Sequence, residues 1–220
     1  MFEPAVRARI LPFALYLAFI LIADLLGRLG WDGQQLRGLY AVKILAVVLA
    51  LVWHRRHYSE LARPRLSLAA AGYSVLAGVL VFVLWINLGQ SWMVMGSSAG
   101  FDPRDGAGTD WSLVAVRLAG GALVVPLMEE LFWRSFLLRW VAAPEFLQVA
   151  PARVGWKAVA VSSVLFGVEH NLWLAGIIAG LAYSLLYMRS GSLWSPIVAH
   201  GVTNGVLGGW IISTGHWTYW

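Results

Sequence analysis

The stretch "VPLMEELFWRSFLL", residues 125–138, places two adjacent glutamates and one arginine in a run that is otherwise almost entirely apolar. Glu130 and Arg134 are four residues apart, so on a helix they share one face and can pair. Glu129 lies about 100° around the same helix and has no obvious counter-ion. Ionisable groups at membrane depth are costly and usually face a cavity or a functional site. Glu129 is therefore the first candidate functional residue.

The rest of the chain indicates that this run lies in a membrane. Of its 220 residues, 60% are hydrophobic and 12% are charged, whereas a soluble domain has about 25% charged residues. A helix needs about 20 apolar residues to cross a bilayer. Runs near that length occur at 10–27, 38–53, 66–88, 112–128, 158–188 and 193–212. We predict an all-α, polytopic membrane bundle of about seven transmembrane helices, with the long run 158–188 divided at His170-Asn171.

The helix that carries the glutamates has an unusual length. If it were continuous over 112–142 it would be about 46 Å long, which exceeds the hydrocarbon core of a bilayer. We therefore expect this helix to tilt. Pro126 is expected to bend it, because proline has no N–H and its ring crowds the carbonyl of Ala122.

We expect one integral membrane domain over residues 1–220, with N-terminal helices in 1–110 and motif-bearing catalytic helices in 111–212. Four arginines in the connection 54–65 indicate that it is cytoplasmic. The acidic connection 89–111 then lies outside. The expected location is the bacterial inner membrane, with the N-terminus cytoplasmic and the C-terminus outside.

Charge and cysteine content exclude several classes of protein. The net charge of +5 fits topology and anionic membrane lipid as a partner; no basic stripe accompanies the arginines, so no nucleic-acid partner is expected. Cysteine is absent, which excludes a thiol protease, a disulfide framework and a cysteine-ligated metal.

Two further segments carry polar residues at helical spacing. In "LFGVEHNLW", residues 165–173, Phe166 and His170 are four apart, and Phe166 can form an apolar floor beneath the imidazole. The flanking Glu169 and Asn171 are expected to point elsewhere and to cap or solvate the helix end. Each histidine motif alone also fits a purely structural role.

The third segment is "SPIVAHGVTNG", residues 195–205, in which His200 and Asn204 are again four apart. Small residues around this pair would let a neighbouring helix approach closely. Polar groups on separate membrane helices need one another or water. We therefore predict that the three segments meet in one polar pocket at the centre of the bundle.

Such a pocket could hydrolyse a carbonyl compound. A carboxylate beside an imidazole can take a proton from water, and a histidine with an asparagine can stabilise an oxyanion. A serine nucleophile is disfavoured because no G-x-S-x-G motif is present. We expect no cofactor, but a zinc site formed by Glu129, His170 and His200 remains an alternative, although no H-E-x-x-H motif is present.

The motifs EExxxR at 129–134, FxxxH at 166–170 and HxxxN at 200–204 together resemble the CAAX protease and bacteriocin-processing family, also called the Abi family. The resemblance covers roughly residues 110–212. The aromatic-rich C-terminal half also resembles the bacterial branch associated with exosortase sorting systems, whose components would then be partners.

The resemblance implies an intramembrane endopeptidase that cleaves a membrane-associated protein or peptide by glutamate-activated water. Residue by residue, it makes Glu129 the general base and His170 its partner in orienting water, and it makes His200 and Asn204 the oxyanion-stabilising pair. Supporting roles fall to the remaining motif residues, Glu130, Arg134 and Phe166.

Two other classes of function remain open from the sequence. A non-catalytic membrane scaffold or immunity factor could bind a peptide in the same pocket. A transporter or proton channel would also use intramembrane glutamate and histidine, but no inverted repeat or pair of broken helices is visible.

Overall fold

The computed structural model describes residues 3–62, 66–96, 100–105 and 108–220. Arg63 and Arg65, two of the arginines in the predicted cytoplasmic connection, lie outside these ranges. The α-helices are α1 (Pro4–Arg28), α2 (Gly33–Leu36), α3 (Leu39–His54), α4 (Leu68–Asn87), α5 (Trp111–Ala119), α6 (Val125–Glu130), α7 (Leu138–Ala142), α8 (Trp156–Val168), α9 (Trp173–Ser190) and α10 (Trp194–Thr214).

The connections contain only short elements. Strands β1 (Arg104–Asp105) and β2 (Gly108–Thr109) pair antiparallel. Turns of 3-10 helix cover Arg55–His57, Ser91–Met93, Phe146–Gln148, Pro151–Arg153 and Trp217–Tyr219. The predicted all-α membrane bundle is therefore confirmed.

Four helical segments are long and apolar enough to cross a membrane: Pro4–Arg28, Gly33–His57, Leu68–Asn87 and Trp111–Ala142. The other three long helices of the described chain, α8 to α10, fall short of that standard; α8 has only 13 residues. The predicted break in the long apolar run is present, because α8 ends at Val168 and α9 begins at Trp173. The seven predicted helices thus exist, but length and apolarity mark four of them as spans.

Apolar side chains on the outer helices face outward. Leu21 of α1, Leu45 and Leu49 of α3 and Leu80 of α4 are all more than half exposed. Buried polar residues lie instead in the interior, and they include Glu130, Arg134 and Ser184. Large apolar surface on helices with a polar interior is the pattern expected of a protein in lipid. The protein is an integral membrane protein.

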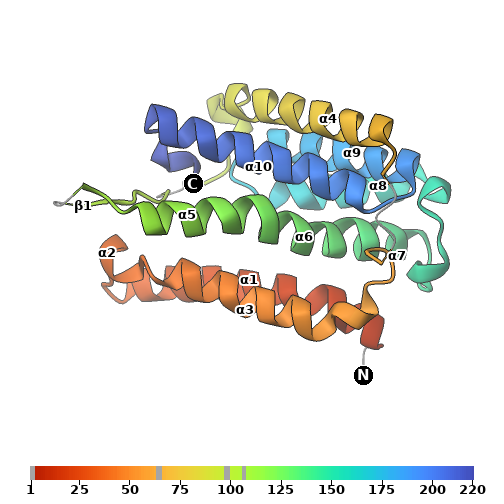
Figure 1. The fold of residues 1–220 in the computed structure, drawn as a ribbon, viewed down its shortest axis with the longest axis horizontal. Coiled ribbons are helices and arrows are strands. Elements are labelled where there is room, and N and C mark those ends of the chain that lie inside the picture. Colours follow the sequence, from red (N-terminus) through yellow and green to blue (C-terminus); the bar gives the residue numbers. More distant parts are fainter. Residues whose placement is uncertain (1–2, 63–65, 97–99, 106–107) are drawn as a thin grey trace.

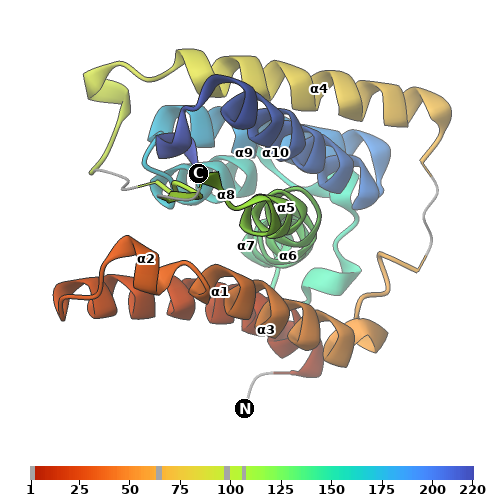
Figure 2. The same ribbon diagram turned by 60° about the vertical axis from the view of Figure 1, so that its left-hand side comes forward.

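The helices form layers around the motif-bearing helix. Figures 1 and 2 show α1 and α3 as an antiparallel pair on one side, α5 to α7 in the middle, and α4 with α8 to α10 on the other side. Within the last group α8 packs on α9, and α4 packs on α10. Along the long axis, the N-terminus lies toward one end, and α2, β1 and the C-terminus lie toward the other (Figure 1). We call this the α2 end.

The helix from Trp111 to Ala142 is continuous but not uniform. Segments of π-helix, Gly120–Val124 and Leu131–Leu137, separate α5, α6 and α7. The sequence predicted a bend at Pro126 and no π-helix. The structure instead places the π-helical segment Gly120–Val124 just before the proline, and such segments occur often at functional sites.

A buried ionic cluster joins the α1–α3 pair to α7, near the end opposite to the α2 end. Arg9 of α1 forms a salt bridge of 2.6 Å with Glu60 and donates a hydrogen bond of 2.7 Å to Ser135. Arg139 also forms a salt bridge with Glu60, and Ser135 donates a hydrogen bond to the same carboxylate. Burial alone would raise the pKa of Glu60, but Arg9, Ser135 and Arg139 outweigh it and hold the pKa below its ordinary value.

Candidate active site

A cavity of about 890 Å³ lies inside the bundle, between the α1–α3 pair and the remaining helices. Its wall includes Glu129, Phe166, His170, His200 and Asn204. The structure therefore brings side chains from all three motifs to one cavity. A volume of this size can hold several residues of a peptide or a molecule of drug size.

Glu129 is the first motif residue of this cavity wall. It lies near the end of α6 and is only 4% exposed. Its Oε2 atom is buried and accepts no hydrogen bond from the residues that the structure describes. Buried carboxylate oxygens are nearly always satisfied by a partner. An unsatisfied oxygen that faces a cavity is thus available to a water molecule or a substrate, as a general base must be.

His170 lies in the break between α8 and α9, where the backbone turns. Its Nδ1 is 2.7 Å from the carbonyl oxygen of Phe166. Because a carbonyl can only accept, Nδ1 carries the proton, and Nε2 of the neutral ring is left as an acceptor. The rings of Phe166 and Trp85 lie 4.8 and 5.2 Å from the imidazole and fix its plane. Phe166 was predicted as this apolar floor; Trp85 was not predicted.

Glu130 points away from Glu129 and contacts two other residues, Arg134 and His200. Its Oε2 lies 3.1 Å from Nε of Arg134, which is the predicted i, i+4 pair, and its Oε1 lies 2.9 Å from Nδ1 of His200. Glu130 and Arg134 are fully buried. Tyr183 stacks on the other side of His200, with ring centroids 5.0 Å apart. The second glutamate therefore orients His200 and neutralises Arg134.

Asn204 supplies a hydrogen bond that the backbone of the motif-bearing helix lacks. In the π-helical segment the N–H of Val125 donates to the carbonyl of Gly120. It therefore does not donate to the carbonyl of Gly121, as it would in a regular α-helix. The next residue, Pro126, has no N–H to offer. The side-chain amide of Asn204 donates to the Gly121 carbonyl at 2.9 Å. One of its two N–H groups is thus fixed, and the other remains available.

Comparison with known proteins agrees with this geometry. Residues 111–206 match the family model described as type II CAAX prenyl endopeptidase Rce1-like. This segment is therefore similar to the CAAX protease family. No curated protein and no solved structure gave a significant match. The matched segment contains every motif residue, and the match supports an intramembrane endopeptidase at the level of the family.

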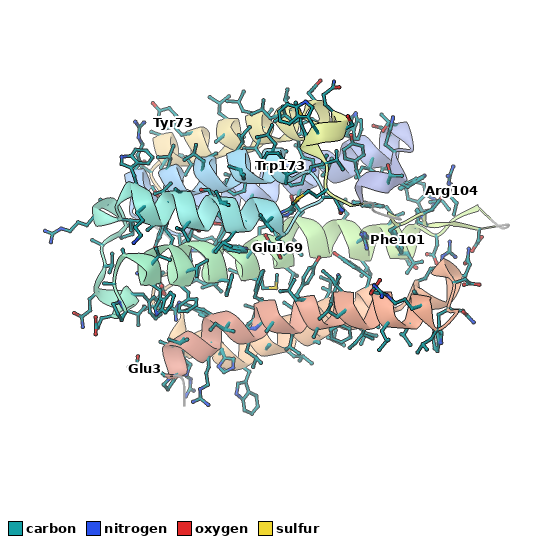
Figure 3. All side chains as sticks on the ribbon, turned by 180° about the vertical axis from the view of Figure 1, so that it is seen from behind. Glu3, Tyr73, Phe101, Arg104, Glu169 and Trp173 are labelled. Carbon is teal, nitrogen blue, oxygen red and sulfur yellow. The ribbon has the colours of Figure 1, made fainter. Side chains whose placement is uncertain are left out.

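The cavity is also lined by residues that the sequence analysis did not place there. Glu169 and Asn171, which were expected to cap or solvate a helix end, both also line the cavity. Figure 3 shows Glu169 midway along the bundle, beside the motif-bearing helix. Its Oε2 atom is buried without a hydrogen-bond partner. Asn171 donates to the carbonyl of Met95 at 2.8 Å and thereby fixes the connection after α4. Adjacency to His170 was the signal that could have found Glu169.

Residues of the α1–α3 pair complete the cavity. Tyr16, Tyr40 and Lys43 line it, together with Arg117 of α5 and the C-terminal Trp220. Four of these five lie outside the part of the chain that carries the family resemblance, so no motif pointed to them. Their contribution is to enclose the α2 end of the cavity with aromatic rings and positive charge.

A metal site was the alternative that the sequence left open. Within the described ranges, no three histidine, aspartate or glutamate side chains are grouped so that they could hold a metal ion. Nδ1 of His170 and Nδ1 of His200 are engaged by Phe166 and Glu130, so Nε2 is the ring nitrogen that each histidine could offer to a ligand.

Proposed function

We propose that this protein is an intramembrane endopeptidase in which Glu129 activates a water molecule for attack on a peptide carbonyl. The observation that carries the proposal is the buried, unsatisfied Oε2 of Glu129 in the cavity that His170 also lines. Carboxylate and imidazole together can hold a water molecule between them, because each offers an acceptor.

In the proposed reaction Glu129 takes a proton from water while the oxygen forms a bond to the carbonyl carbon. The carbonyl oxygen becomes an oxyanion. The C–N bond then breaks as Glu129 passes the proton to the departing amine, so the carboxylate is regenerated. His170, through Nε2, orients the water and does not need to change its protonation state.

His200 and Asn204 would stabilise the oxyanion. To donate to the oxyanion as well as to Glu130, the ring of His200 needs a proton on both Nδ1 and Nε2. Asn204 offers its second N–H while the first stays on Gly121. Each oriented donor is typically worth about 3 kcal/mol in the transition state.

The proposed substrate is a membrane-associated protein or peptide, and the proposed location is the bacterial inner membrane with the N-terminus in the cytoplasm. Arginines of the connection after α3 support this orientation. A link to an exosortase-type sorting system is part of the proposal. It rests only on the aromatic-rich C-terminal half, which includes Trp210, Trp217 and Trp220.

The test compares membrane peptides from cells that produce the wild-type protein or Glu129→Gln. We expect a defined set of cleaved termini to be absent from the variant, while the variant accumulates to the same level. A second inactive variant, His170→Ala, should lose the same set. If both variants yield the wild-type termini, or if they still capture a partner although no termini ever differ, a binding role replaces the enzymatic one.

A further inference from the structure

A second cavity, of about 350 Å³, lies near the end of the bundle opposite to the α2 end. Four parts of the chain form its wall: the connection after α3 with Glu60, α7 with Arg139, α9 with Tyr187, and the connection from α9 to α10 with Ser192. None of its lining residues also lines the cavity of Glu129. The second cavity is therefore separate, and its volume is at the lower end of the range for small-molecule sites.

Three polar groups of this wall have no hydrogen-bond partner among the described residues. Nε and Nη2 of Arg139 donate to Ser135 and Glu60, but Nη1 donates to no described residue. Within the same ranges, Oη of Tyr187 makes no hydrogen bond, and Oγ of Ser192 is buried without a partner. Arg139 and Tyr187 are only 4% and 1% exposed, and Cζ of Arg139 is 6.0 Å from the ring centroid of Tyr187. Because buried polar groups nearly always have a partner, these three groups indicate a ligand site.

The hydrogen-bonding capacity that remains in this cavity suits an anion. Glu60 is the carboxylate of the wall, and both of its oxygens are already occupied. Its Oε1 accepts from Ser135 and Arg139. Its Oε2 accepts from Arg9 and Ser59. The three unpartnered groups are a guanidinium N–H, which can only donate, and two hydroxyls, which can donate to an anion.

The charges around the cavity also favour an anion. Arg9 and Arg139 share the single carboxylate of Glu60, and no other described carboxylate forms an ion pair with either arginine. The cluster therefore has a surplus positive charge, and a buried charge without a counter-ion is costly. Arg153 and Arg189, both exposed, lie within two positions of lining residues. Basic pockets between membrane helices are typical sites for phosphate-containing head groups.

Contacts within the protein hold these donors in place. Oγ of Ser190 donates to the carbonyl of Ser192 at 3.1 Å, and the N–H of Ser192 donates back to that Oγ at 3.2 Å. Gly191 between them has a φ of +66°, which glycine adopts without strain. On the other side of the cavity, Arg139 donates to both the carbonyl and the Oγ of Ser135. A site that is ordered in this way loses less conformational entropy when a ligand binds.

We propose that this cavity binds a phosphate group, with Arg139, Tyr187 and Ser192 as its donors. A phosphate presents oxygens in several directions, as three donors from three segments require, whereas a carboxylate presents two oxygens in one plane. The exposed Ser59 and Gly191 open the cavity to the surface of the bundle. The phosphate can therefore belong to the head group of an anionic lipid or can be free in solution, and the experiment separates these sources.

A bound phosphate would connect α7 to the segment that leads into α10, the helix of His200. It would also neutralise the surplus charge of the cluster that joins the α1–α3 pair to α7. Both effects stabilise the folded protein, so binding can be followed through thermal unfolding and needs no peptide cleavage. The site and the proposed peptidase function are therefore independent, and either can be verified if the other fails.

The experiment measures the Tm of the full-length protein in dodecyl maltoside, a detergent that contains no phosphate. Inorganic phosphate and phosphatidylglycerol are added in separate titrations, with sodium chloride at matched ionic strength as the reference. At saturation we expect phosphatidylglycerol, inorganic phosphate or both to raise the Tm of the wild type by at least about 3 °C. A rise with inorganic phosphate assigns the site to free phosphate as well, and a rise with phosphatidylglycerol alone assigns it to a lipid head group.

The decisive variant combines Tyr187→Phe with Ser192→Ala. Because neither hydroxyl has a partner among the described residues, its Tm without ligand should equal that of the wild type. Its affinity for the ligand should be at least about tenfold weaker, because two hydrogen bonds to an anion are lost. The matched control combines Tyr73→Phe with Ser91→Ala, which removes two exposed hydroxyls outside the cavity and should respond as the wild type does.

Two results would overturn the proposal directly: no rise of the wild-type Tm with either ligand, or an equal rise in the variant that lacks the Tyr187 and Ser192 hydroxyls. Oleate serves as an anionic lipid without phosphate, and it should cause no rise that depends on these hydroxyls. If oleate stabilises the wild type but not the variant, the cavity binds a carboxylate, and the assignment to phosphate is wrong.

Discussion

Oε1 of Glu130 lies 2.9 Å from Nδ1 of His200, although the two residues are 70 positions apart in the chain. Because of this contact, the two adjacent glutamates have different roles. Glu129 keeps a free oxygen on the cavity, whereas both oxygens of Glu130 face cationic or N–H partners. Substituting each glutamate in turn should therefore distinguish the catalytic role of Glu129 from the structural role of Glu130.

Glu130→Gln should destabilise the protein, whereas Glu129→Gln should inactivate it without destabilising it. Removing the charge of Glu130 leaves Arg134 buried without a counter-ion, which typically costs about 3–5 kcal/mol. Thermal unfolding in detergent, measured beside peptide cleavage, checks both expectations. A stable, fully active Glu130→Gln protein would contradict the division of roles.

Asn204→Ala should lower kcat by about 10²–10³-fold, because an oxyanion donor is lost. It should also cost about 1–3 kcal/mol of stability, because the Gly121 carbonyl loses its only side-chain donor. Asn87→Ala is the matched control, since Asn87 also donates to a backbone carbonyl, that of Val83, but lies on α4 outside the cavity wall. Loss of activity in the control as well would point to a general effect of removing asparagine.

The cluster around Glu60 should make docking of the α1–α3 pair sensitive to acid. The pKa of Glu60 is lowered in the folded protein from an ordinary value of about 4.5. Its contribution is therefore complete above about pH 4.5 and is lost as the pH falls through the lower, folded-state pKa. Unfolding of the wild type as a function of pH should show this loss.

Glu60→Gln should be less stable than wild type at neutral pH and should lack this acid step, because Gln does not titrate. Glu3→Gln is a suitable control, since Glu3 is exposed. An unchanged acid profile in Glu60→Gln would show that other carboxylates cause the transition.

Close packing of α8 on α9 should be necessary for activity. A Cβ atom at Gly180 would lie 2.9 Å from the Cα of Ser163, which is backbone and cannot move aside easily. Gly180→Ala should therefore separate the helices, displace His170 and reduce cleavage at least about tenfold, with a lower Tm. Gly72→Ala, where nothing lies within 4 Å of the added atom, should behave as wild type.

Thorough chelation should leave cleavage unchanged if Glu129 alone activates water. The measurement is the cleavage rate after treatment with a strong chelator and again after zinc is added back. Activity that disappears with the chelator and returns with zinc would replace the proposed mechanism by the metal-dependent one.

Local patterns were sufficient to predict the class of fold and the location of the break between α8 and α9. Apolar runs identify membrane helices because every helix that crosses the lipid needs about 20 apolar residues. The i, i+4 spacings also placed Phe166 beneath His170 and Glu130 beside Arg134, because both contacts arise within one turn of helix.

Contacts between distant segments could not be read from local spacing. The π-helical segment before Pro126 depends on the side chain of Asn204, which reaches Gly121 from another helix. Likewise, Lys43 lies on a helix without any recognisable motif, and only the packing of α3 against the rest of the bundle brings it to the cavity. The position of Glu169 at the cavity was not predicted, because α8 ends there and its helical spacing no longer dictates the direction of the side chain.

The π-helical segment Gly120–Val124 has a consequence for insertions and deletions. A π turn holds one residue more than the corresponding α turn, and each residue rotates a helix by about 100°. Deleting one residue between 120 and 124 would restore a regular helix and leave Arg117 at nearly its present angle to Glu129, because the wider turn absorbs the rotation of the extra residue. The deletion would instead remove the hydrogen bond of Asn204, since the Gly121 carbonyl is free to accept it only where the π turn withholds a backbone N–H.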